Sequence, residues 1–257
     1  MRADAICGRP ADVHVLPTYF LTGPPNTEVR LTLRKAWRTN GFCSDQARAS
    51  CAGVSMDLEL RAPPADGKPP RSIAFAATHS ASGAFETEVL RPASPLVPGL
   101  YEVRAVERSA RVEPAVIALF RVAGEADSVA PTWAGLTSAR WVRRARGVID
   151  LECGSPLLQL EAARATDDMT SDVAINFAIW LAQPGVTIDY TKPPLLYVNA
   201  DERNAQLKIG LGNTEEGTSN FAPVSTDAKA PYPALKLGVR AVDLAGNMSP
   251  PSEALVR

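Results

Sequence analysis

The sequence predicts an all-β protein made of two tandem β-sandwiches. Short apolar runs alternate with 22 prolines and 17 glycines scattered along the chain, a pattern typical of strands joined by turns. The length of 257 residues suits two sandwiches of roughly 100 residues each. A hydrophobic fraction of 46% is enough for each sandwich to bury a core.

The segment just before the C-terminus carries the clearest hairpin signal. Apolar Leu237, Val239 and Ala241 share one face of this segment and the basic residues 236 and 240 share the other, as expected of a strand packed on one side. Gly246 lies between Asp243 and Asn247, so the chain can turn there with a positive φ. The prolines at 250–251 cannot donate backbone hydrogen bonds. We therefore expect the last strand at the edge of its sheet.

A change in composition marks the boundary between the two sandwiches. The apolar run 115–122 is followed by the small and acidic residues of 124–131, which end in a proline. We divide the chain into domains at 1–124 and 129–257. The strands expected in the first domain cover residues 27–35, 54–61, 72–77, 84–90, 99–107 and 116–122.

Charge and hydropathy argue against nucleic acid or membrane as partners. The 27 basic and 28 acidic residues are mixed along the chain, which leaves a net charge of −1. No apolar stretch reaches the roughly 20 residues of a membrane helix. Four arginines between 140 and 146 form the one local basic patch, which we interpret as a solvated strand edge or an inter-domain contact.

The cysteines indicate an oxidising compartment. Cys43 and Cys51 flank a polar stretch, so a disulfide between them is predicted, with about 2.5 kcal/mol of loop entropy removed from the unfolded chain. Cys7 and Cys153 each precede a glycine, and either a second bridge or two buried free thiols fits them. Since a disulfide needs an oxidising compartment, we expect a secreted, periplasmic or cell-surface protein. The start of the chain has no apolar leader, so we expect a signal peptide that has been removed or is absent from this chain.

The first half resembles bacterial immunoglobulin-like domains of the surface-layer type. The segment Leu96-Val97-Pro98-Gly99-Leu100-Tyr101 is similar to the Pro-Gly turn that delivers a tyrosine into the penultimate strand of those domains. Phe120 falls where their last strand often has an aromatic residue. The resemblance covers about residues 10–123 and implies an immunoglobulin-like sandwich.

The second half resembles a fibronectin type III domain. An Asp-bearing loop at 165–168 precedes an aromatic-alternating strand at 175–180, and the closing hairpin completes the likeness. Ala162 stands where that family usually keeps a tryptophan, and Leu235 stands where it keeps a tyrosine. Other aromatic residues are expected to fill the core, namely Trp133, Trp141 and Trp180.

No motif for catalysis, cofactor binding or metal binding is predicted. The chain has no GxSxG, HExxH or GxxxxGK[ST] motif, and only two histidines. Acidic residues occur in two loops that a fibronectin-like topology can bring to one end, so a shared calcium site is an alternative. We favour their role as turn formers. These residues are Asp167, Asp168 and Asp172 in one loop and Asp243 and Asn247 in the other.

These observations favour a non-catalytic, exported bacterial surface or periplasmic module. A protein partner would be recognised through loops or strand edges. The alternative is a carbohydrate-binding or accessory domain of a secreted hydrolase, which requires exposed aromatic side chains. The candidates for glycan contact are Trp37, Trp133, Trp141 and Tyr197.

Overall fold

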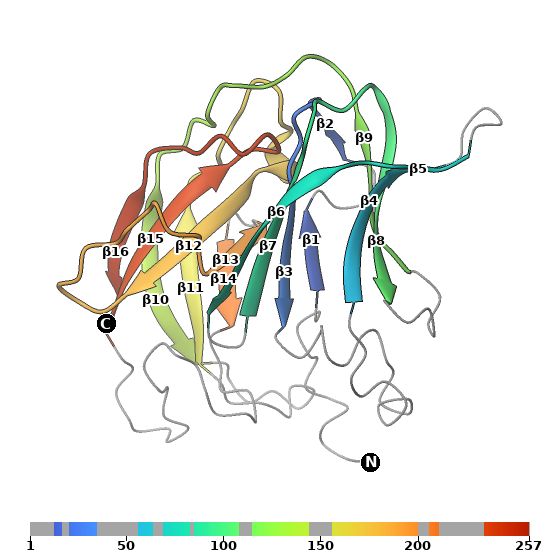
Figure 1. The fold of residues 1–257 in the computed structure, drawn as a ribbon. Helices are drawn as coiled ribbons and strands as arrows, with labels where there is room; N and C mark the ends of the chain where they lie inside the picture. Colours follow the sequence, from blue (N-terminus) through green and yellow to red (C-terminus); the bar gives the residue numbers. More distant parts are fainter. Residues whose placement is uncertain are drawn as a thin grey trace, which may run out of the picture.

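The computed structural model is all-β, which confirms the predicted fold class. It describes residues 13–16, 21–34, 56–63, 69–82, 85–107, 115–143, 156–199, 206–210 and 234–256. The strands form four sheets that lie in two halves side by side (Figure 1). None of the helices in these residues is long and apolar enough to cross a membrane.

The first half is a sandwich of two sheets whose strands all come from residues 13–122. The first sheet has the order β1 (Val13–Leu16), β3 (Val29–Arg34), β7 (Phe85–Pro92) and β6 (Phe75–Ser82). The second sheet has the order β2 (Thr22–Gly23), β9 (Ala115–Val122), β8 (Gly99–Glu107), β4 (Met56–Ala62) and β5 (Arg71–Ser72). Only β2 and β9 pair in parallel among the paired strands of the described residues.

The core of this sandwich follows the alternation of its strands. Val29 and Leu31 of β3 pack against side chains from the second sheet, because every second side chain of a strand faces the same way. Tyr101 is fully buried, stacks on Phe120 with ring centroids 5.8 Å apart, and donates a hydrogen bond from its hydroxyl to the Val97 carbonyl oxygen at 2.8 Å. The tyrosine turn expected from the sequence is therefore formed.

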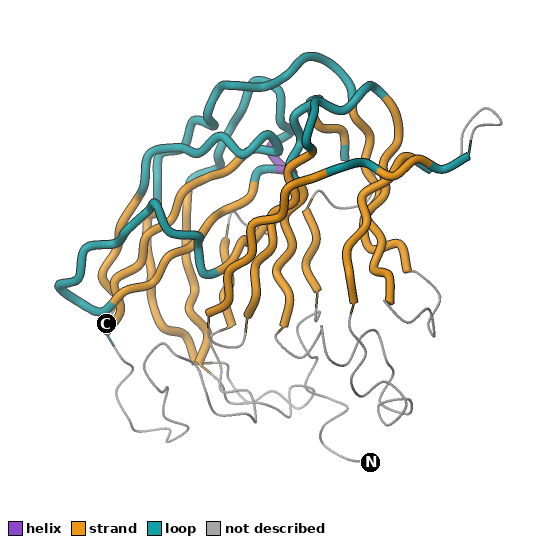
Figure 2. Tube along the Cα trace, in the orientation of Figure 1, coloured by secondary structure: helices purple, strands orange, loops and turns teal. Residues whose placement is uncertain are grey.

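The second half contributes two further sheets from residues 136–256. One sheet has the order β10 (Leu136–Arg143), β11 (Pro156–Ala162) and β14 (Gln206–Gly210). The other has the order β13 (Leu196–Asn199), β12 (Asn176–Ala182), β15 (Leu235–Val242) and β16 (Ser252–Val256). A single 3-10 turn, η2 (Asp172–Ala174), appears in the described residues and lies among the loops at the upper end of Figure 2.

The second core is filled by two of the expected tryptophans. Trp141 is buried in it, and Trp133 packs edge to face on Phe177 with centroids 5.2 Å apart. Leu235 is also part of this core, and Ala162 is buried at the end of β11. The third candidate, Trp180, is not part of this core and lies in a separate buried cluster.

The strands predicted in the first domain agree with the structure except at three places. The segment predicted at 72–77 is two strands, because the chain leaves β5 in one sheet and continues as β6 in the other. The short strands β1 and β2 were not predicted, since four and two residues are too few for a period to be read. The last strand, β16, lies at a sheet edge directly after the two prolines, as predicted.

Two predictions remain untested by this structure. All four cysteines lie outside the described residues, so the bridges Cys43–Cys51 and Cys7–Cys153 stay predictions. The predicted boundary between domains 1–124 and 129–257 falls between β9 and β10. Whether each half folds by itself also stays a prediction.

Removal of the Tyr101 hydroxyl tests whether the tyrosine turn stabilises the first sandwich. We expect Tyr101→Phe to lower the free energy of unfolding by about 1 kcal/mol, because one partly buried hydrogen bond is lost. Urea denaturation followed by tryptophan fluorescence measures the change. Leu100→Ala, at the adjacent exposed position, serves as control and is expected to change stability by less than about 0.5 kcal/mol. Equal stability of Tyr101→Phe and wild type would contradict a stabilising role of the tyrosine turn.

Candidate functional site

The two halves meet through the faces of two sheets. The sheet containing β3 and β7 lies against the sheet containing β12 and β13 (Figure 1). A separate buried cluster spans this junction, with Val89 from the first half and five residues from the second. The five are Ala178, Trp180, Ile188, Tyr197 and Val242.

Strand β3 is buried on both faces at the junction. Val29 and Leu31 point into the first core, so Arg30 and Thr32 point the other way, toward the second half. Thr32 Oγ1 donates to the Tyr197 carbonyl oxygen and accepts from the Tyr197 amide, both at 3.3 Å. The polar face of this strand is therefore a contact surface and not a solvated one.

Arg30 is the central residue of the junction. Its side chain is fully buried, and its Nη1 donates to the Asp243 carbonyl oxygen at 2.6 Å. Its Nη2 donates to Glu28 Oε2 at 3.1 Å, and its guanidinium lies 5.6 Å from the centroid of the Tyr197 ring. Arg91 also donates to Glu28. We call this set of contacts the Arg30 joint; its members are Glu28, Arg30, Thr32, Tyr197 and Asp243.

The closing hairpin of the second half docks on the first half beside this joint. The Glu28 amide donates to the Leu244 carbonyl oxygen at 2.7 Å. Gly246 has φ +94°, as expected for the turn, and a Cβ atom there would lie 2.6 Å from the Glu28 carboxylate. Glycine is therefore required both by the turn and by the close approach of the two halves.

Asp243 and Asn247 are turn formers, as the sequence favoured. Asp243 Oδ1 accepts from the Asn247 amide at 2.9 Å, and Oδ2 accepts from Asn247 Nδ2 at 2.8 Å. Burial raises the pKa of Asp243 to about 6, although the bonds from Asn247 act in the opposite direction. Asp127 raises this pKa further, and Arg30 lowers it.

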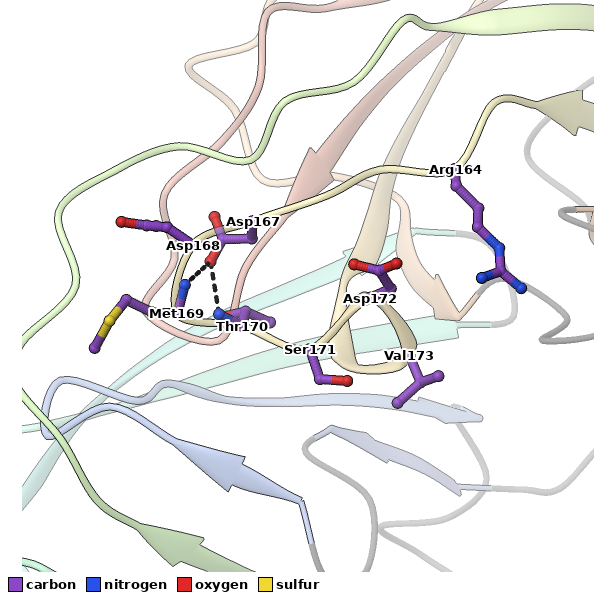
Figure 3. A pocket seen from close by; sticks show the side chains of 8 residues that line it. All are labelled: Arg164, Asp167, Asp168, Met169, Thr170, Ser171, Asp172 and Val173. Carbon is purple, nitrogen blue, oxygen red and sulfur yellow. Dashed lines mark hydrogen bonds between the residues drawn. The ribbon is translucent and has the colours of Figure 1, made fainter.

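The other acidic loop lies at the same end of the molecule. The Leu244 amide of the hairpin donates to Thr170 Oγ1 at 3.3 Å, which brings the two loops together at one end, the arrangement that the calcium alternative requires. Arg164 and residues 167–173 line a hollow in the surface (Figure 3). Asp167 and Asp168 lie next to each other, whereas Asp172 lies apart from them on the far side of Ser171.

Asp127 completes a group of three carboxylates that sequence reasoning did not find. One oxygen of Asp127, one of Asp167 and one of Asp168 lie within 4.8 Å of one another. Burial raises the pKa of Asp127, the Val129 amide opposes this, and the charges of the other two carboxylates raise the pKa further. Asp127 had been assigned to the boundary segment by composition, and nothing in its sequence context marks it as buried.

The aromatic residues considered for glycan contact are used in packing. Trp141 is in the second core, Trp133 packs against that core and donates to the Ala163 carbonyl oxygen at 3.0 Å, and Tyr197 is in the Arg30 joint. Trp37 lies outside the described residues. The described aromatics among the candidates therefore form no exposed sugar-binding platform.

The histidines and the basic patch do not form a site in the described residues. His14 on β1 and His79 on β6 lie on opposite edges of one sheet, roughly 14 Å apart at ordinary strand spacing. Arg140 pairs with Glu161 at 3.4 Å on an exposed surface. Arg144 and Arg146 lie outside the described part of the chain.

Comparison with known proteins gives only distant structural likeness. No protein-family model matches the sequence, and no curated protein matches it. The chain is similar to the fibronectin(III)-like modules of Clostridium thermocellum CbhA, with a TM-score of 0.26 and 14% identity over 95% of this chain and 92% of that one. It is also similar to PcoC, a methionine-rich copper resistance protein from Escherichia coli, with a TM-score of 0.26 and 16% identity over 43% of this chain and 99% of that one. Neither likeness defines the function of this chain.

Replacement of Arg30 tests the joint. We expect Arg30→Met to lower the free energy of unfolding by about 3 to 5 kcal/mol, because it leaves buried Glu28 with one fewer counterion and the Asp243 carbonyl oxygen with only the longer bond from the Gly246 amide. Chemical denaturation measures the loss. The control Arg140→Met removes an exposed pair and should cost no more than about 1 kcal/mol. Similar losses in the two variants would contradict the central role of Arg30.

The pH dependence of stability tests the burial of Asp243. Its folded pKa of about 6 lies above the ordinary value of 3.8, so the folded state holds the proton more tightly than the unfolded chain. Its contribution to stability is present below the ordinary value and is lost as the pH rises through about 6. We expect the stability difference between wild type and Asp243→Asn to fall over this range in EDTA buffer, measured by denaturation at each pH. A constant difference would contradict the prediction.

Proposed function

We propose that this chain is a non-catalytic module of an exported bacterial protein that holds two β-sandwiches in a fixed arrangement and binds a protein partner. The partner adds an extended strand to the free edge of β6. Export is supported by the cysteine spacing, and fixed geometry is supported by the buried Arg30 joint. The single observation that supports this binding surface is that β6 is a long sheet edge with no proline, lysine, arginine, aspartate or glutamate.

Strand β6 is a long sheet edge without the usual protection. Its eight residues read Phe-Ala-Ala-Thr-His-Ser-Ala-Ser, with no proline, lysine, arginine, aspartate or glutamate. It pairs with β7 along its full length and ends its sheet among the described strands. Residues 76–79 are exposed. An edge of this kind presents unpaired backbone groups to another chain.

The other sheet edges in the described part of the chain differ from β6. The strands β1, β2, β5 and β13 have four residues or fewer. Lys208 lies in β14, Arg140 and Arg143 lie in β10, and β16 carries Glu253 directly after two prolines. Short length, charge and proline are the features by which proteins block edge pairing. Among these sheet edges, β6 is therefore the one best suited to pair with a strand of another protein.

The sheet behind β6 provides a rigid template for a partner strand. Strand β7 pairs with β6 on one side and with β3 on the other, and β3 carries Arg30 into the junction. Ser80 and Thr87 also bond across the β6–β7 ladder through their hydroxyls at 2.5 Å. Backbone hydrogen bonds supply affinity in strand addition, and the small exposed side chains of β6 allow close approach.

A site-specific photocrosslinker tests this proposal. The crosslinking amino acid is placed at Ala77, on the exposed edge, and in a control chain at Val129, which is 53% exposed and belongs to the segment between β9 and β10. After irradiation in the source cells, we expect a discrete protein adduct from position 77 and none from position 129. Mass spectrometry maps the attached segment of the partner.

A charged residue on the edge supplies the second arm of this test. Thr78→Lys should reduce the adduct from position 77 by about tenfold or more, because a charge opposes strand pairing at an edge. Its melting temperature should stay unchanged, since Thr78 is exposed. No adduct from position 77, an equal adduct from position 129, or an adduct that Thr78→Lys leaves intact would overturn the proposal.

A further inference from the structure

The three carboxylates at the junction come from two separate parts of the chain. Asp127 belongs to the segment between the sandwiches, and Asp167 and Asp168 belong to the loop between β11 and β12. One oxygen from each lies within 4.8 Å of the other two. No salt bridge within the described residues reaches any of the three. Three carboxylates are therefore concentrated without a salt-bridge partner in the part of the chain that the structure describes.

Two of these side chains are fixed through one oxygen each. Asp127 Oδ1 accepts from the Val129 amide at 2.9 Å, and Asp167 Oδ2 accepts from the Met169 and Thr170 amides at 3.1 and 2.7 Å. The main chain of Asp127 is also held, because Asn26 Nδ2 donates to its carbonyl oxygen at 2.6 Å and Asn26 Oδ1 accepts from its amide at 2.9 Å. These carboxylates cannot turn to solvent without losing those bonds.

The second oxygen of each of these two carboxylates has no donor in the described residues, which indicates a bound ligand. Asp127 is only 3% exposed, and its Oδ2 is buried without a hydrogen-bond donor in the described structure. The same holds for Asp167 Oδ1. A buried charged oxygen without a partner is costly, and like charges nearby add to the cost. A bound cation would remove both costs at once.

The donor set selects the class of cation. The group contains only carboxylate oxygens, with no histidine or cysteine among its members, so a hard cation suits it and zinc does not. The three oxygens lie within 4.8 Å of one another, so a single ion can contact all of them. Three protein carboxylates suit calcium better than Mg²⁺, which usually takes one or two carboxylates and keeps several of its waters. Backbone carbonyls and water complete the six to eight ligands that calcium takes.

We propose that Asp127, Asp167 and Asp168 bind a calcium ion that ties the segment between the sandwiches to the second sandwich. Asn26 connects Asp127 to the first sandwich, so the ion strengthens the junction on the side of the acidic loop. This site differs from the pairing of that loop with Asp243 and Asn247 considered from the sequence, because those two residues bond to each other. It is independent of the partner proposed for β6.

Calcium titration of the full chain after EDTA dialysis tests the site. We expect a measurable heat of calcium binding by isothermal titration calorimetry. The melting temperature should rise by roughly 5 °C or more in about 5 mM CaCl₂. MgCl₂ at the same concentration should give a clearly smaller rise. No binding heat together with no rise in melting temperature, or an equal response to Mg²⁺, would overturn the proposal.

Two asparagine variants distinguish calcium binding by the three named carboxylates from nonspecific attraction of cations to the acidic loop. Asp168→Asn removes an exposed ligand and should weaken calcium binding by about tenfold or more, while the melting temperature in EDTA does not fall, because one of three like charges is removed. Asp172→Asn is the matched control, since Asp172 lies in the same hollow outside the group, and it should bind calcium as wild type does. Wild-type affinity in Asp168→Asn, or an equal loss in Asp172→Asn, would refute the assignment.

Discussion

The arrangement of the two sandwiches depends on one buried positive charge. Arg30 projects from the outer face of β3 into a junction where it is fully buried, so its charge depends on acceptors from the protein. Both Nη atoms have an acceptor, whereas Nε has none in the described residues. Glu28 supplies charge, and the Asp243 carbonyl oxygen supplies an acceptor from the other half. Because the acceptor is backbone, its position is fixed by the closing hairpin. The relative placement of the halves follows from that requirement.

Periodicity predicted the strands well but could not predict what covers their second face. The strand at 99–107 was predicted with its observed bounds, because apolar and polar positions alternate clearly and a Pro-Gly turn precedes it. In β3 the same alternation places Arg30 and Thr32 on the polar face, which is the pattern of a solvent-exposed surface. Only the second half, which is far away in sequence, converts that face into a junction.

The candidate cation site shows the same limit of sequence reasoning. The acidic loop at 167–168 was recognised, and the turn role of Asp243 was correctly favoured. Asp127 was missed because its burial arises from its bonds to Asn26, a contact between residues 101 positions apart. From the sequence, turn formation and ligand binding are alternatives, yet Asp167 can do both, since the turn uses only Oδ2 and leaves Oδ1 without a donor in the described residues.

Gly246 has a consequence for how the sequence can evolve. A side chain at this position would collide with the Glu28 carboxylate, and Glu28 is in turn retained by the charge of Arg30. Three positions spread over the whole chain therefore constrain one another's substitution. In homologues, loss of the arginine at position 30 should be accompanied by loss of the acid at position 28, whereas glycine should persist at position 246, because its φ of +94° strains other residues even when the acid is gone.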